Sequence, residues 1–283
     1  MKENDQTDIS NQPIGLQLWS LRADMEENPG VTIQKVADMG YNYIESYAGP
    51  QGIFWGMKPQ EFSSFLSDHG LYCLSSHVDP KITMTYSDLQ LGNLVEQACE
   101  AGIEYLVNPW LGYLKDDKLI RRALRKLADH SSLIEDCKIV YHHHHFEIEN
   151  NPQGKYIDLL LELCRNSPLQ MELDIYWLRE GGEDPLPFLK KHKDVYELVH
   201  LKDRLLPKEV NSILSVEKPE DDFFPVNLSC CLGNGCLDVE GIVDWLMQED
   251  GVHLIVEQER YKTSPMDCIT KNYHYLSDIM KHA

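Results

Sequence analysis

Short apolar runs alternate with amphipathic segments along most of the chain. The first run, 14–20, precedes a segment of helical periodicity over about 31–39 that ends at Gly40, and the same order then recurs. The predicted strands are 14–20, 43–47, 71–77, 105–107, 138–143, 170–175, 196–201 and 252–257. Nearly continuous apolar strands, each followed by a helical pattern, are typical of parallel strands that are covered on both faces.

These repeats predict an α/β fold, a single (β/α)8 TIM barrel over residues 14–283. Residues 1–13 have no apolar core segment, so we expect a disordered lead-in rather than a signal peptide. A doubly wound open sheet is the alternative fold. It would require a glycine-rich phosphate turn after an early strand, and neither GxGxxG nor GxxxxGKS occurs.

One long stretch, 204–236, follows the predicted seventh strand and interrupts the repeat. It contains Phe223, Phe224 and a Gly233-Asn234-Gly235 turn. Loops of this length inside a compact domain are usually functional or disordered. We expect either a lid that excludes water from a site, with Phe223 or Phe224 as the covering side chain, or a plain surface loop.

The charge of the chain excludes some partners. The 283 residues include 26 Lys plus Arg against 46 Asp plus Glu, a formal net charge of -20. Such a surface repels nucleic acid and anionic membranes, although single basic groups could still hold a small phosphate ester. No apolar run reaches the length of a membrane span, and the eight cysteines are scattered, so we expect a cytoplasmic protein with reduced thiols and no disulfide framework.

Ionisable residues lie at or just beyond the ends of the last four predicted strands, where the active site of a (β/α)8 barrel is built. They are Glu147, Asp174, His200 and Glu257. Three carboxylates and one imidazole suit a single divalent cation (Mn²⁺, Mg²⁺, Co²⁺ or Zn²⁺). Candidate substrate-binding residues, also at strand ends, are His77, Trp110, His144, Lys202 and Trp19.

Five motifs in fixed order carry a resemblance. GLQLWSLR (15–22), YHHHHFE (141–147), ELDIYW (172–177), VHLKD (199–203) and VEQE (256–259) resemble the xylose isomerase-like TIM-barrel family of sugar isomerases and epimerases. The resemblance implies one divalent metal ion held by Glu147, Asp174, His200 and Glu257. Many relatives carry YHNHDFE, so His142 and His144 match the motif, whereas His143 and His145 replace Asn and Asp.

The resemblance also implies a reaction. Proton abstraction beside a carbonyl, through a metal-bound enediolate, would use Glu147 and Glu257 as base and acid on opposite faces of a sugar or keto-polyol. Lys202 would neutralise the developing charge or bind a hydroxyl.

Three alternatives stay open. They are a lyase of the same fold that dehydrates an inosose or a dehydroshikimate-like substrate, an endonuclease-type hydrolase, which the acidic charge disfavours, and a catalytically silent sugar-binding barrel. A homo-oligomer is compatible with the sequence, which does not reveal the oligomeric state.

Overall fold

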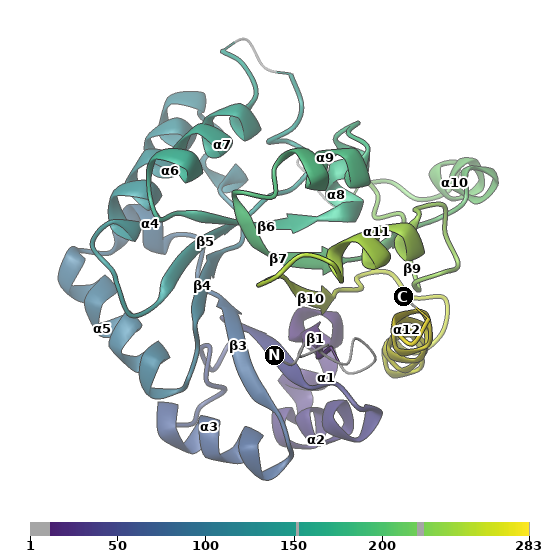
Figure 1. Cartoon of the computed structure of the whole chain (residues 1–283), viewed down its shortest axis with the longest axis horizontal. Helices are drawn as coiled ribbons and strands as arrows, with labels where there is room; N and C mark the ends of the chain where they lie inside the picture. The colour runs from purple at the N-terminus through teal and green to yellow at the C-terminus, as the bar shows by residue number, and fades with distance from the viewer. Residues whose placement is uncertain (1–11, 151–152, 220–223, 283) are drawn as a thin grey trace, which may run out of the picture.

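Eight parallel strands form a closed barrel in the order β1-β10-β7-β6-β5-β4-β3-β2, with the helices outside it (Figure 1). This computed structural model describes residues 12–150, 153–219 and 224–282, so most of the predicted lead-in lies outside the described residues. The barrel strands are β1 (Ile14–Gln17), β2 (Tyr43–Tyr47), β3 (Tyr72–His77), β4 (Tyr105–Asn108), β5 (Lys138–His142), β6 (Gln170–Asp174), β7 (Tyr196–Leu201) and β10 (His253–Val256). The prediction of a (β/α)8 barrel is confirmed.

A helix follows each barrel strand, and the first of them covers the helical pattern expected over about 31–39. These helices are α2 (Pro29–Met39), α3 (Pro59–Asp68), α5 (Asp88–Glu100), α6 (Asp117–Ser131), α7 (Tyr156–Asn166), α9 (Pro185–Lys191), α11 (Val239–Leu246) and α12 (Pro265–Met280). Local capping explains several of the boundaries. The Ser87 hydroxyl accepts a hydrogen bond from the Gln90 backbone N–H, and the Gln90 side chain accepts one from the Ser87 N–H, which fixes the start of α5.

Short helices at the strand ends were not predicted. They are the 3-10 helices η2 (Leu18–Leu21) and η3 (Gly112–Leu114), and the α-helices α1 (Arg22–Glu27), α4 (Ile82–Thr85) and α8 (Ile175–Glu180). The predicted sixth strand is one residue too long because the Asp174 carboxylate caps α8, accepting hydrogen bonds from the backbone N–H groups of Tyr176 and Trp177. Tyr176 and Trp177 therefore lie on a helix.

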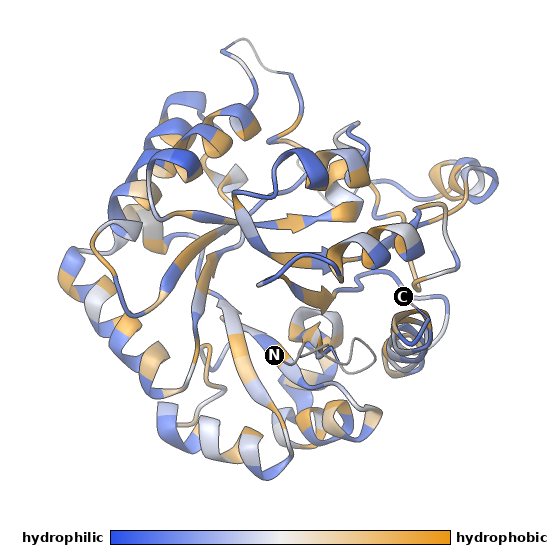
Figure 2. Cartoon of the chain, viewed as in Figure 1, coloured by the Kyte–Doolittle hydropathy of each residue, from blue (hydrophilic) through white to orange (hydrophobic). Residues whose placement is uncertain are grey.

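The barrel interior is layered. Its amino-terminal half holds an apolar cluster of Tyr43, Leu74, Tyr105, Val107, Val140, Leu198 and Ile255. Gly15 makes room for this cluster, because a Cβ atom there would lie 2.1 Å from the Tyr43 ring. Toward the carboxyl ends of the strands the buried side chains become polar and include Gln17, Glu45, His142, Glu172 and His200. Figure 2 shows apolar residues concentrated on the strands and on the inward sides of the helices.

The stretch 204–236 has regular structure, which corrects the expectation of an irregular loop. It contains α10 (Pro207–Leu214), and β8 (Asp203–Arg204) pairs antiparallel with β9 (Ser229–Cys230). Helix α10 projects at the periphery of the molecule (Figure 1). Phe223 lies outside the described residues, so only Phe224 of the two predicted covering residues can be placed.

A disulfide joins Cys231, just after β9, to Cys268 of α12. The expectation that all cysteines are free thiols is therefore wrong. The two residues are 37 positions apart in sequence, and their pairing depends on the packing of α12 beside the insertion, which no local pattern reveals.

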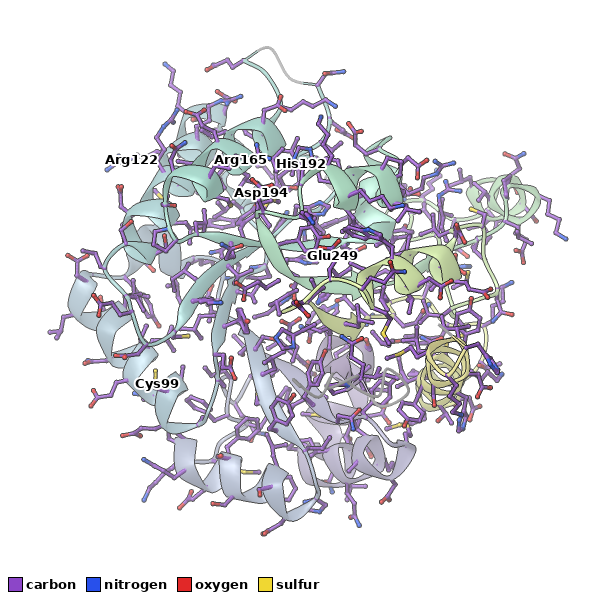
Figure 3. The ribbon with its side chains drawn as sticks, in the orientation of Figure 1. Cys99, Arg122, Arg165, His192, Asp194 and Glu249 are labelled. Carbon is purple, nitrogen blue, oxygen red and sulfur yellow. A yellow bond between two sulfur atoms is a disulfide. The ribbon has the colours of Figure 1, made fainter. Side chains whose placement is uncertain are left out.

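Ion pairs link elements near the amino-terminal end of the barrel. Arg165 of α7 lies 2.8 Å from Asp194, and Lys193 lies 3.2 Å from Glu249, with Arg165, Asp194 and Glu249 labelled in Figure 3. Half-exposed pairs such as these contribute little to stability. Among the described residues, no helix is long and apolar enough to span a membrane.

Candidate metal and active site

Two overlapping groups of potential metal ligands lie inside the carboxyl-terminal end of the barrel. One consists of His142, Asp174, His200 and Glu257, the other of His77, His142, Glu172 and His200. All members are buried, and within each group the ligand atoms lie within 4.8 Å of one another. The first group combines two imidazoles with two carboxylates at the ends of β5, β6, β7 and β10, a donor set that suits a divalent cation.

Three of the four predicted metal ligands, Asp174, His200 and Glu257, are thus brought together. The fourth, Glu147, is not in either group. Its carboxylate accepts hydrogen bonds from the Tyr141 hydroxyl and from the His144 backbone N–H, the latter at 2.8 Å. Glu147 comes after β5, in the loop that leads to α7, and the structure places His142, the last residue of β5, where the sequence reasoning expected Glu147.

Strand alternation could have revealed His142. Side chains two residues apart in a strand share a face, so the buried core residue Val140 predicts that His142 also points into the barrel. The same rule places Glu172 with Asp174 and His200 with Lys202. Glu147 lies an odd number of residues from His142 and beyond the end of the strand, so its position cannot be inferred in this way.

His143 faces away from the ligand group and ties β5 to β6. Its Nε2 atom accepts a hydrogen bond from the Asp174 backbone N–H at 3.1 Å, and its Nδ1–H donates to the His144 carbonyl at 3.1 Å. Burial lowers the pKa of His143 to about 4, so the ring is neutral in this bonding pattern. His143 stands where many relatives have Asn. Its hydrogen bonds therefore link β5, which carries His142, to β6, which carries Asp174.

Two deeper carboxylates contact the ligand histidines. Glu45 of β2 lies 2.7 Å from Nε2 of His200, and Glu172 lies 3.1 Å from Nδ1 of His142. Burial opposes ionisation of Glu45, but His77 and His200 hold its pKa well below its usual range. In the sequence, Glu45 is one of the polar residues at strand ends, but neither it nor Glu172 was assigned a role in the site.

His77, a predicted substrate-binding residue, belongs to this deeper layer. Its Nε2 atom lies 2.8 Å from Glu172 and 3.0 Å from Glu45, and the residue is 8% exposed. Burial alone would lower the pKa of His77, yet the two carboxylates raise it to about 10. His77 is therefore a buried cation that is paired beneath the ligand group.

Lys202 lies at the opposite, outer side of the ligand group and has no exposed surface. Its Nζ atom lies 2.6 Å from Glu257, 2.7 Å from Glu259 and 3.2 Å from Asp174. Burial would lower the pKa of Lys202, but these carboxylates raise it well above its usual value. The ammonium group is therefore a fixed positive charge beside two of the candidate ligands.

The two candidate carboxylate ligands differ in proton affinity. Burial raises the pKa of Asp174 to about 6, against the opposing effect of Lys202. Burial acts in the same direction on Glu257, but Lys202 and His200 hold its pKa well below the usual range. The Oδ2 atom of Asp174 and the Nδ1 atom of His142 are buried and form no well-oriented hydrogen bond, although they lie 3.2 Å from Lys202 and 3.1 Å from Glu172. Buried polar atoms whose hydrogen-bonding capacity is incompletely used fit a bound cation, because such atoms are costly in a protein interior.

Aromatic side chains form one wall of the site. Phe224, from the insertion, has ring centroids at 5.2 Å from Trp110, 5.2 Å from His144 and 6.0 Å from Trp177. Trp177 also lies 5.0 Å from His144 and faces the Lys202 ammonium at 5.3 Å. The predicted substrate residues Trp110, His144 and Lys202 thus gather at one place.

Trp19, the remaining predicted substrate residue, has a different environment. It follows β1, is 39% exposed and packs edge-on against Tyr47 at 5.1 Å. No ring contact joins it to the Trp110–Phe224–Trp177 wall among the described residues.

Comparison with known proteins supports the fold assignment. The chain matches no protein-family model. It is 27% identical over 199 residues to a protein of Clostridium beijerinckii described as inosose dehydratase, and the match spans 66% of this chain and 60% of that relative.

Solved structures align over nearly the whole chain. A sugar phosphate isomerase/epimerase from Parabacteroides distasonis superposes with a TM-score of 0.71 at 20% identity, covering 94% of this chain and 97% of the other. A xylose isomerase-like TIM barrel protein from Mycobacterium smegmatis, solved in complex with magnesium, superposes with a TM-score of 0.64 at 12% identity, covering 98% and 99%. The chain therefore has the fold of the xylose isomerase-like TIM barrels, which confirms the resemblance at the level of the fold.

Proposed function

We propose that this chain is a divalent-metal-dependent sugar isomerase or epimerase that moves a proton on the carbon beside the carbonyl of a sugar or keto-polyol. The observation that carries the proposal is the convergence of His142, Asp174, His200 and Glu257 beside the buried ammonium of Lys202. These four side chains would hold the metal ion. When bound, the ion would polarise the substrate carbonyl and acidify the neighbouring C–H group.

The side chains around the ligand group supply the rest of the chemistry. Lys202 is held as a cation by three carboxylates, so it can stabilise negative charge that develops on a substrate oxygen without a rearrangement of the site. Glu257, ionised and 2.6 Å from Lys202, is the proposed proton acceptor on that side. Proton return can use the Glu257 carboxyl group that took up the proton, or the Lys202 ammonium.

His144, on the β5 side, stays neutral, so its proposed role is to hydrogen-bond a substrate hydroxyl rather than to return the proton. Burial lowers the pKa of His144 well below its usual value, and its buried Nδ1 atom has no hydrogen-bond partner. Glu147 accepts the His144 backbone N–H, so we propose that it positions His144 rather than acting as a base itself. This assignment replaces the acid–base pair of Glu147 and Glu257 that the resemblance implied.

A dehydratase of the same fold is the second candidate, and the relative described as inosose dehydratase favours it. Isomerisation and dehydration both begin with removal of the proton beside the carbonyl, and they differ in whether a β-hydroxyl then leaves. The proposed residues serve either outcome, so product analysis has to separate them.

The test is solvent exchange. Purified protein would be stripped with chelator, loaded in turn with Mn²⁺, Mg²⁺, Co²⁺ and Zn²⁺, and incubated in D2O with ketoses and inososes. Deuterium uptake without loss of water supports the isomerase, whereas an enone absorbance with loss of water supports the dehydratase. The Glu257→Gln variant should abolish exchange, while Glu197→Gln, at the amino-terminal end of the barrel, should retain it. If no combination of metal and substrate gives deuterium exchange, both enzyme proposals fail, and the catalytically silent sugar-binding barrel is the alternative that is left.

A further inference from the structure

We infer that the substrate is an uncharged ketose or keto-polyol and that the site rejects its phosphate esters. This inference rests on the proposed function and specifies its substrate class. It comes from the loops after β7 and β10, where backbone donors and most basic side chains are already engaged by carboxylates of the chain itself.

The loop after β7 carries the first part of the argument. In TIM barrels, phosphate groups are often bound by backbone N–H groups of the loops that follow the seventh and eighth strands. Here the carboxylate of Asp203 fills such a cluster, accepting hydrogen bonds from Arg204 at 2.7 Å, Gly235 at 2.8 Å and Leu237 at 3.1 Å. The residue is 1% exposed. An internal anion thus occupies the backbone donors that an external phosphate would need.

The fit between Asp203 and the glycine turn is close. A Cβ atom added to Gly235 would lie 2.2 Å from Oδ1 of Asp203 and 2.2 Å from the Arg204 carbonyl oxygen. The absence of a side chain at Gly235 therefore leaves the space that the Asp203 carboxylate occupies. The Gly233-Asn234-Gly235 turn by itself resembles a phosphate-binding loop, but here the Asp203 carboxylate lies against it.

The start of α11, the helix that follows the glycine turn, has one of its backbone donors already engaged. The amino end of α11 is capped by Asp238, which accepts the Gly241 N–H at 3.1 Å. Phosphate binding at a helix start uses unpaired N–H groups, so this cap leaves fewer of them available.

Positive charge beside the ligand group is balanced by carboxylates. The charge of Lys202, which is proposed to act on the reacting oxygen, is shared by Asp174, Glu257 and Glu259, so no surplus positive charge remains for a phosphate dianion. Three further basic residues of the loops after β7 and β10 form ion pairs, Arg204 with Glu180, Arg260 with Glu217 at 2.6 Å and Lys262 with Glu209 at 2.5 Å. Lys208 and Lys218, in the insertion that contains α10, form no ion pair within the part of the chain that the structure describes. With a formal net charge of -20 on the whole chain, a phosphate dianion would approach against an acidic field.

Basic residues at other strand ends stay unpaired in the described ranges of the chain, among them Lys81, Lys115 and Arg22. The guanidinium of Arg22 lies 5.2 Å from the Trp19 ring centroid, and its Nη1 atom lies 3.5 Å from the Trp19 carbonyl oxygen. No carboxylate pairs with Arg22 among the described residues. It lies on the β1 side, whereas the aromatic wall formed by Trp110, Phe224 and Trp177 suits the C–H face of a neutral sugar ring.

The experiment compares matched pairs on the Mn²⁺-loaded protein. D-ribulose is compared with D-ribulose 5-phosphate and D-fructose with D-fructose 6-phosphate, with inorganic phosphate as a control for metal chelation. Deuterium uptake from D2O gives kcat/KM, and isothermal titration gives binding without any need for turnover. We expect the free sugar of each pair to be favoured by about tenfold or more in both measurements, because juxtaposed like charges are costly.

Equal or better exchange or binding of a phosphorylated member would overturn the inference. Repeating that titration with Arg22→Gln would then show whether Arg22 is the unexpected phosphate ligand. If no sugar exchanges deuterium, the proposed function fails. The titration still decides the substrate class in that case, since preferential binding of the free sugars would uphold this inference and preferential binding of the esters would refute it.

Discussion

The Nε2 atom of His200 lies 2.7 Å from Oε1 of Glu45, and both side chains are fully buried. This contact fixes the orientation of the ring, because it directs the Nδ1 atom toward Glu257, 3.2 Å away. A carboxylate that accepts the second N–H of a metal-binding imidazole sets its tautomer and raises its basicity. Glu45 and Glu172 are therefore proposed to prepare His200 and His142 for the metal ion.

This arrangement predicts that Glu45→Gln and Glu172→Gln each weaken metal binding by about 10- to 100-fold, because outer carboxylates contribute that much at comparable sites. Isothermal titration with Mn²⁺ and the d–d spectrum of the Co²⁺ protein provide the measurements. Glu197→Gln is the matched control, since Glu197 pairs with Lys138 at 2.5 Å, at the other end of the barrel. Unchanged affinity in both site variants would show that Glu45 and Glu172 only fill the interior.

The choice between His142 and Glu147 as a ligand gives a second prediction. His142→Ala should reduce metal content to background, because it removes one of four converging donors. Glu147→Gln should keep the metal, since the Glu147 oxygens contact Tyr141 and the His144 N–H instead. Elemental analysis of both purified variants, with circular dichroism to check folding, makes the comparison. The reverse result would restore Glu147 as the ligand.

Glu147 also predicts a pH dependence of stability. Burial raises its pKa to about 8 in the folded protein, against an ordinary value of 4.5. Because the folded state binds this proton more tightly than the unfolded state, the stabilisation is complete below about pH 4.5 and is lost as the pH rises through about 8.

The stability of the wild type relative to Glu147→Gln should therefore fall across the window from about pH 4.5 to 8. Denaturant unfolding of both proteins at several pH values measures this difference, in which the titration of all other groups largely cancels. A difference that stays constant with pH would mean that Glu147 is ionised throughout.

The Cys231–Cys268 disulfide predicts a redox-dependent stability. It closes a loop over 37 residues, for which chain entropy gives a stabilisation of about 4 kcal/mol. Cys231→Ser should therefore unfold at lower denaturant concentration than the oxidised wild type and should not respond to reductant. Cys99→Ser, at an exposed free thiol, is the control. An oxidised wild type that is no more stable than its reduced form would contradict the prediction.

Much of the fold followed from local patterns. The alternation of apolar runs with helical segments predicted the barrel, and the polar ends of its last strands predicted Asp174, His200 and Glu257, which converge in the structure. These features are visible in a sequence because strand and helix periodicities are short-range, and because a parallel barrel brings the carboxyl ends of all its strands to one side.

Tertiary structure alone decided the remaining features. The contacts of Glu45 with His200, of Cys231 with Cys268 and of Asp203 with the Gly235 N–H join residues that are 155, 37 and 32 positions apart. Such pairings depend on strand register and on the packing of an insertion, which local periodicity does not encode. The four histidines attract attention in the sequence, but the register of β5 decides their roles, since it turns His142 toward the candidate ligands and His143 toward the Asp174 backbone.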